Sequence, residues 1–428
     1  MAEQSRVIPA LSGELLQYLV HEQNDNTIRF VLRYPVRLDT LAMQTAVLAV
    51  VDSVDVLHAA FVVGKGGAAW HVQDTYSIAS CFRCFCIQGD PAARALEESL
   101  LPMALEDSVK LRCTLVHGQN GSALAVSISH LCADGVDSRY LLYKLAEAYR
   151  LCRETGSCAG LRIKSGSRAP EQVYNHLSRR EMRSLLRNPT TGVKTGFPFP
   201  GTGAGEKRIT CRRIAAPVMK AARERARADG ATANDLLLTA CYRAIAACEG
   251  MAPGTPLSLM SMMDLRRHCE GGDSEGLSNL SGSLPTVLEK GVQGSFADTL
   301  RDIAAQTAQL KEDPLAGLAG MPILHGLIRR VPLGLLMRVT DHVYGSMAVG
   351  MTNLGQLDSA TLTLDHAAPE TGWFGGPVKK KPGMQLSVVS VAGACTICVY
   401  GEYEQADAAM LEKMLEQVER EIRDYSEQ

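Results

Sequence analysis

Residues 127–135, Ser-Ile-Ser-His-Leu-Cys-Ala-Asp-Gly, hold the side chains best suited to catalysis in this 428-residue sequence. His130 is the strongest general-base candidate because an imidazole titrates near neutral pH. Asp134 follows four residues later, and Gly135 lets the chain turn sharply because it has no Cβ. A histidine that ends a strand is usually structural, and Asp-Gly is a common turn sequence. The local pattern alone therefore leaves both interpretations open.

The flanking sequence indicates how these residues are positioned. An apolar run over 123–129 predicts a strand, paired with 109–117 through the Gly-rich turn 118–122. Residues 136–152 predict the helix that follows. His130 would then lie at a strand end, where loops place functional groups on a rigid scaffold.

The remaining elements alternate along the chain without a regular strand-helix-strand repeat, which favours an α+β fold over a doubly wound one. The predicted strands are 27–34, 56–63, 69–72, 81–87, 208–214, 257–264, 347–352, 360–364, 385–391 and 395–400. The predicted helices are 40–51 after the capping residue Asp39, then 91–101, 170–186, 216–228, 233–248 after the capping residue Thr232, 296–310, 322–343 and 405–425.

The length exceeds what one hydrophobic core usually serves, so we predict two domains. Residues 153–206 are rich in Gly, Ser, Thr, Pro and Arg. We place an N-terminal unit at 1–160, a linker at 161–206 and a C-terminal unit at 207–428.

Composition excludes several function classes. A net charge of −2 and 5% aromatic residues give no case for nucleic acid or for an anionic membrane. No apolar stretch reaches the length of a membrane span, and the N-terminus shows no export signal. We expect a soluble, cytoplasmic protein.

Thirteen cysteines raise a second possibility, a zinc- or thiol-dependent protein. Residues 81–86 and 395–398 contain Cys-x-x-Cys spacings, which can bind zinc. Both lie in strand-like runs without the turns that usually present zinc thiolates. We therefore expect reduced, mostly buried cysteines and no metal site.

The motif His130-x-x-x-Asp134-Gly135 resembles the signature of the superfamily of chloramphenicol acetyltransferase, plant BAHD acyltransferases, mycobacterial polyketide-associated acyltransferases and condensation domains of nonribosomal peptide synthetases. Five further segments resemble this superfamily in the same order, over nearly the whole chain. They are 41–61, 230–238, Met263-Asp-Leu-Arg266, Ser278-Asn279 and Thr352-Asn-Leu-Gly355.

This resemblance implies two chloramphenicol acetyltransferase-like subdomains, arranged as a V around a central tunnel. It implies that His130 deprotonates a hydroxyl or amine acceptor as it attacks an acyl thioester. Asp134 would pair with Arg266 as a structural ion pair, and Gly135 would keep the tunnel open. Other residues expected near the tunnel are Ser129, Asn279, Ser281, Ser283, Asn353 and Trp373.

For some of these residues alternatives stay open. Asn279 and Asn353 could line the tunnel or hold turns, and Ser281 or Ser283 could donate to the oxyanion of the tetrahedral intermediate. Ser129 stands where condensation domains usually carry a second histidine, which favours the free-standing acyltransferases. Trp373-Phe-Gly-Gly376 does not match the late plant motif Asp-Phe-Gly-Trp-Gly.

The resemblance also implies the partners: a small-molecule acceptor, and acyl-coenzyme A or an acyl- or peptidyl-carrier protein as thioester donor, with no bound cofactor. Lys379-Lys-Lys381 could meet a phosphate of the donor or be a solvated loop. Two related halves would make a monomer sufficient. The main alternative is a non-catalytic binding module for a carrier protein or small ligand.

Overall fold

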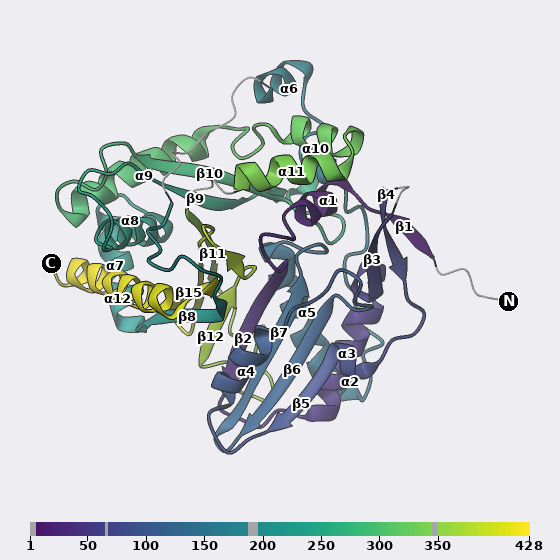
Figure 1. Ribbon diagram of the computed structural model, residues 1–428. Coiled ribbons are helices and arrows are strands. Elements are labelled where there is room, and N and C mark those ends of the chain that lie inside the picture. Colours follow the sequence, from purple (N-terminus) through teal and green to yellow (C-terminus); the bar gives the residue numbers. More distant parts are fainter. Residues whose placement is uncertain (1–5, 65–66, 187–195, 345–348) are drawn as a thin grey trace.

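The computed structural model describes residues 6–64, 67–186, 196–344 and 349–428. Two β-sheets form its centre, and each carries its own layers of helices (Figure 1). Three predicted features fall outside the described residues: the turn at 65–66, the middle of the linker at 187–195 and the start of the strand at 347. The protein has the predicted α+β architecture.

The first half of the chain builds a five-stranded sheet in the order β12-β2-β7-β6-β5 and a small sheet of β1, β4 and β3. Its elements are β1 (Val7–Pro9), α1 (Ser12–Leu19), β2 (Thr27–Tyr34), α2 (Thr40–Asp52), a 3-10 turn (Asp55–His58), β3 (Ala59–Gly64), β4 (Gly67–Val72), α3 (Ile78–Cys81), β5 (Phe82–Cys86), α4 (Pro91–Ser99), β6 (Leu111–Gly118), β7 (Gly121–Ser129) and α5 (Gly135–Thr155).

Alternating side chains divide this sheet into two buried faces. Phe30 of β2 and Val126 of β7 belong to the large core that also contains α2 and α5. Val31 and Ala125, one residue away on each strand, pack instead with Ala92 and Ala95 of α4. Successive side chains of a strand point to opposite faces, so helices cover both faces, and β7 is buried throughout.

The second half builds a seven-stranded mixed sheet in the order β10-β9-β11-β14-β15-β13, with β8 pairing β15. Its elements are two 3-10 turns (Leu265–His268 and Glu270–Gly272), β8 (Glu206–Ile214), α7 (Ala216–Ala228), α8 (Ala233–Ala246), β9 (Leu257–Asp264), β10 (Ser281–Leu288), α9 (Phe296–Glu312), α10 (Met321–Arg330), α11 (Leu333–Tyr344), β11 (Val349–Gln356), β12 (Thr371–Gly375), β13 (Lys379–Lys380), β14 (Gln385–Val391), β15 (Ala394–Tyr403) and α12 (Gln405–Glu427).

One face of this sheet packs under α7, α8, α9 and α12, at the left of Figure 1. The opposite face lies against β12, which contacts both β14 and β15. Strand β12 pairs antiparallel with β2, from Thr371 opposite Arg33 to Gly375 opposite Arg29. A strand from late in the sequence therefore completes the first sheet and connects the two halves.

Three sequence-based predictions of elements are wrong. Residues 360–364 form turns rather than a strand. The helix predicted over 322–343 is divided into α10 and α11 before Pro332, because proline disfavours a helical conformation in the residue that precedes it. The helix predicted over 170–186 is a 3-10 turn (Pro170–Val173) followed by the short α6 (Arg179–Leu185).

Candidate functional site

His130 lies directly after β7, at the junction of the two halves. Its backbone N–H donates to the carbonyl of Asn26 at 2.7 Å. Its side chain is partly exposed, whereas the nine residues of β7 before it are buried. The ring Nδ1 lies 2.9 Å from Oδ1 of Asn279, which precedes β10 in the other half. A residue 149 positions away therefore orients the histidine.

The hydrogen bonds of Asn279 determine which nitrogen of His130 carries the proton. The Asn279 Nδ2 donates to the carbonyls of His130 at 2.8 Å and of Leu131 at 3.1 Å. Carbonyls only accept, so the amide NH₂ must face them and Oδ1 must face the imidazole. An acceptor at 2.9 Å requires a proton on Nδ1. The neutral ring then has its lone pair on Nε2, as a general base needs.

The surroundings keep this imidazole neutral. Burial lowers the pKa of His130 below its usual value, and the cationic Lys379 acts in the same direction. The Asp134 charge and the hydrogen bonds of the ring oppose this shift without cancelling it. At neutral pH the ring is therefore an available base.

Asp134 does not face the histidine; it organises the loop around it. Its side chain caps α5 by accepting from the backbone N–H groups of Val136 and Asp137, each at 3.0 Å. It also accepts from the N–H of Leu280 at 2.8 Å, next to Asn279. Arg266 binds the carboxylate with both terminal nitrogens, at 2.9 and 3.1 Å. The ion pair expected from the sequence is present, and Asp134 and Arg266 are both buried.

The sequence analysis did not predict the other members of this charge network, Asp137 and Lys164. Asp137, one turn into α5, lies 2.7 Å from Arg266 Nη2 and 2.6 Å from Lys164 Nζ. It also accepts from the backbone N–H of Ser278 at 2.7 Å. Two buried carboxylates thus face one arginine and one lysine. Burial and the neighbouring Asp134 charge raise the pKa of Asp137. Burial opposes ionisation of Asp134, but Arg266 holds its pKa below the usual range.

A sequence signal for Asp137 did exist, since it follows Asp134, the capping residue of α5, by three positions, a spacing that brings side chains together on a helix. Lys164 carried no such signal because it lies in the predicted linker. In the structure that segment is held against the second half: Ser165 pairs with Gly276, and Gly166 N–H donates to the Glu275 carbonyl at 3.0 Å.

Gly135 begins α5 against a neighbouring strand. A Cβ there would lie 3.0 Å from Leu354 Cδ2 and 4.0 Å from Phe374 Cζ. The glycine therefore lets the two halves approach closely at this point. Its role beside an open tunnel stays a prediction.

Ser281 and Ser283 occupy exposed positions on the same face of β10, close in sequence to Asn279. The Ser281 hydroxyl lies 3.3 Å from Asp134 Oδ2 and donates to it. A hydroxyl engaged in this way has no proton left for an oxyanion. Ser283 is then the better of the two candidates.

Three other predicted residues do not join this site. Ser129 is buried, and its hydroxyl accepts from the Leu131 N–H at 3.4 Å. Asn353 holds a turn by accepting from the N–H of Gly355 at 2.9 Å, and it contacts Asn234 of α8 at 3.2 Å. Trp373 lies opposite Val31 and packs on the α4 side of the sheet. Along β7 that position is five residues before His130, about 17 Å away at the rise of a strand.

The three lysines 379–381 have different environments. Lys381 donates to Asp407 at 2.8 Å and to the Gly201 carbonyl at 2.9 Å, so it anchors the linker to α12. Lys380 is exposed. Lys379 is the member whose charge acts on His130.

The cysteines form no metal site that the structure describes. In the described ranges no three His, Cys, Asp or Glu side chains gather as metal ligands. Cys81 ends α3, Cys84 and Cys86 lie on β5, and Cys395 and Cys398 lie on β15, which belongs to a different sheet. Within the same ranges no helix is long and apolar enough to cross a membrane.

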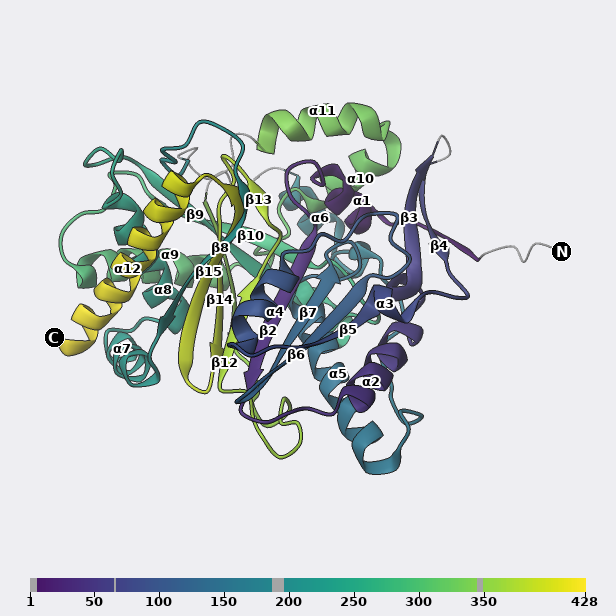
Figure 2. The ribbon, with the colours of Figure 1, turned by 60° about the horizontal axis from the view of Figure 1, so that its bottom comes forward.

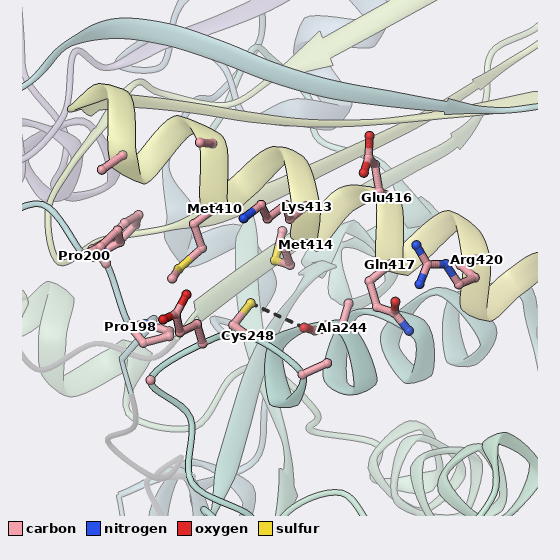
Figure 3. A pocket seen from close by; sticks show the side chains of 16 residues that line it. Pro198, Pro200, Ala244, Cys248, Met410, Lys413, Met414, Glu416, Gln417 and Arg420 are labelled. Atoms are coloured by element: carbon pink, nitrogen blue, oxygen red, sulfur yellow. Dashed lines mark hydrogen bonds between the residues drawn. The ribbon is translucent and has the colours of Figure 1, made fainter.

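A separate groove of about 920 Å³ lies between α8 and α12 (Figure 3). The linker residues Pro198 and Pro200 border it on one side and Met410, Lys413 and Arg420 of α12 on another. It contains no residue of the His130–Asn279 site, so it is not part of the arrangement described above.

Comparison with known proteins supports the fold. No protein-family profile and no curated protein matches the sequence. The structure is similar to polyketide synthase associated protein 5 from Mycobacterium tuberculosis, at 15% identity over 97% of each chain and a TM-score of 0.69. It is similar to the first condensation domain of the CDA synthetase, at 14% identity over 99% and 98% of the two chains and a TM-score of 0.70.

A third similar structure is the trichothecene 15-O-acetyltransferase from Fusarium sporotrichioides, at 13% identity over 98% of this chain and 95% of that chain and a TM-score of 0.69. Identities this low establish the fold and leave the activity to be argued from the site. The chain therefore has the two-subdomain α+β fold of condensation domains and the acyltransferases that resemble them.

Proposed function

We propose that this protein transfers an acyl group from a thioester to a hydroxyl or amine, with His130 as the general base. One observation carries the proposal: the hydrogen bonds of Asn279 leave the lone pair of the neutral His130 ring on Nε2, on a partly exposed side chain. The fold fits the proposal, since an acetyltransferase and condensation domains share it.

In the proposed reaction His130 carries out both proton transfers. His130 Nε2 takes the proton from the acceptor as its oxygen or nitrogen attacks the thioester carbonyl carbon. The tetrahedral intermediate collapses, the carbon–sulfur bond breaks, and the imidazolium returns the proton to the leaving thiolate. A positioned base contributes about 10²–10⁴-fold to such a reaction.

The donor is acyl-coenzyme A or the phosphopantetheine thioester of a carrier protein. A phosphate of that arm would meet Lys379, a cation whose charge acts on the imidazole. The acceptor is a small molecule. Neither co-substrate requires a resident cofactor or metal.

The first test measures thiol release from acyl-coenzyme A donors of increasing chain length, with mixed alcohol and amine acceptors. The same donors are also presented on a phosphopantetheinylated carrier protein. Wild type is compared with His130→Ala and with His176→Ala, which removes an exposed histidine on another surface. We expect acceptor-dependent release in wild type and His176→Ala, and a loss of at least 10²-fold in His130→Ala.

Equal release from wild type and His130→Ala would remove the histidine as the base. Absence of release with every donor, together with carrier-protein binding that His130→Ala leaves unchanged, would instead favour the non-catalytic binding module. The fold supports that alternative as well, because one fold hosts several functions.

A further inference from the structure

The helices α10 and α11 expose an aliphatic surface. Five large apolar side chains on these two helices are at least 38% exposed: Ile323, Leu324, Leu327, Leu335 and Val339. Their spacings place Ile323 and Leu327 on one face of α10 and Leu335 and Val339 on one face of α11, each pair four residues apart. Figure 2 shows α11 along the outer edge of the molecule. An apolar surface of this kind usually marks an interaction site.

Basic side chains border this surface. Residues 321–344, which span both helices, contain three arginines and one aspartate, Asp341. Arg329 pairs with Glu171, whereas Arg330 and Arg338 are exposed. The short helix α6 contacts α10 and adds three exposed arginines, Arg179, Arg180 and Arg183, against one glutamate. The whole chain carries −2, so this surface has the opposite sign to the protein average.

The apolar and basic character together identify the partner. We propose that α10 and α11, with α6 beside them, form a docking surface for an anionic phospholipid bilayer. Amphipathic helices with aliphatic and basic side chains lie in the bilayer interface, inserting the former and attracting anionic headgroups with the latter. The helices have 10 and 12 residues, half the length of a membrane span, which suits binding parallel to the surface.

A second copy of the chain fits this surface less well. A symmetric dimer places the same patch on both sides of the interface. The exposed Arg330 and Arg338 of both copies would then lie within one interface, where like charges repel one another. Protein interfaces also favour aromatic anchors, and the five exposed apolar residues here are all aliphatic.

The surface lies one helix away from the candidate site. Helix α1 contacts both α10 and α11. Within α1, a Cβ built on Gly13 lies 3.7 Å from the carbonyl oxygen of Asn279. A bilayer bound to α10 and α11 is therefore close to the junction of the two halves, where His130 lies. The docking proposal does not depend on catalysis.

The test is flotation with vesicles of phosphatidylcholine alone or with 30% phosphatidylglycerol. One variant, Arg330→Gln/Arg338→Gln, removes charge, and a second, Leu335→Ser/Val339→Ser, removes apolar surface. The matched control Arg213→Gln/Arg227→Gln removes two exposed arginines from β8 and α7. Thermal melting and circular dichroism confirm that each variant is folded.

We expect wild type and the control to float with anionic vesicles, less so at high salt, and neither to bind phosphatidylcholine strongly. The charge variant should lose about 30-fold in partition coefficient, from the contribution of two basic residues near an anionic surface. The apolar variant should lose binding as well. Absence of wild-type binding to anionic vesicles overturns the proposal, as does equal binding by all variants. Dimerisation in sedimentation that only the apolar variant loses would assign the surface to a second copy.

Discussion

Replacing Asn279 by alanine tests what the orientation of His130 contributes while the histidine itself stays in place. The substitution removes the acceptor of Nδ1–H and the donor to the carbonyls of residues 130 and 131. Each hydrogen bond contributes about 0.5–1.5 kcal/mol net, so the free energy of unfolding should fall by about 1.5–4.5 kcal/mol at most. Partial exposure of Asn279 lets water replace some of these bonds and places the expected loss near the lower limit.

The effect on catalysis follows from the tautomer. Without Asn279 nothing fixes the proton on Nδ1, and Nε2 is protonated in part of the population. Leaving a buried donor unsatisfied costs about 1–3 kcal/mol, which corresponds to about 5- to 150-fold in rate. We therefore expect Asn279→Ala to lower kcat/KM for thiol release by that factor, with a smaller change in KM. Asn353→Ala is the matched control, because Asn353 also bonds to backbone and to another asparagine but not to His130.

The variant Asn279→Asp adds a readout that a purely structural role would not change. A carboxylate beside Nδ1 favours the imidazolium and raises the pKa of His130. The acid limb of the kcat/KM profile should therefore move to higher pH, and activity at neutral pH should fall. An Asn279→Ala enzyme with wild-type kcat/KM, or an Asn279→Asp enzyme with an unmoved acid limb, would refute the assignment of Nε2 as the base.

Three further predictions concern pH and the buried charges. Because burial lowers the pKa of His130, wild-type kcat/KM should stay constant from pH 8 down to about 6.5 and decline only below that value, as a pH series of thiol release would show. Asp134→Ala removes one of the two buried carboxylates that pair with Arg266, so urea unfolding should report a loss of about 3–5 kcal/mol; wild-type stability with lost turnover would give Asp134 a direct role in the reaction. Burial lowers the pKa of His325 to about 4, so the unfolded chain binds a proton between pH 6.5 and 4 that the folded protein does not. Stability should therefore fall by about 2 kcal/mol from pH 7 to 5, and His325→Gln should flatten that dependence in urea melts at both pH values.

Local patterns in the sequence were sufficient to predict most elements. Strands β2 and β9 and helix α7 have the predicted bounds, because alternating or helical apolar spacing defines them. Strand β12 was not predicted, since its residues Thr371–Gly375 carry two glycines and no long apolar run. What makes it a strand is the edge of β2, which only the folded chain supplies.

The candidate site shows the same division between local and distant information. His130, Asp134 and Gly135 were predicted because they lie within six residues, and resemblance to a family supplied Arg266. Asn279 was predicted as a tunnel residue or a turn residue, but no pattern indicated that its amide faces Nδ1. Asp137 and Lys164 were missed because their importance comes from sharing one arginine and one buried volume. The net charge of −2 likewise gave no indication of a surface with six arginines on α6, α10 and α11.

The two halves are coupled at the histidine rather than merely placed beside each other. His130 belongs to the first half, but the second half provides its Nδ1 acceptor, the arginine that neutralises the α5 cap and the edge strand β12. The predicted linker provides Lys164 to the same network. A fragment ending at residue 160 would therefore retain the complete His130-to-Gly135 motif while losing the contacts that Asn279 and Arg266 make with it. The motif is a sign of the site, and the junction between the halves is what orients the imidazole.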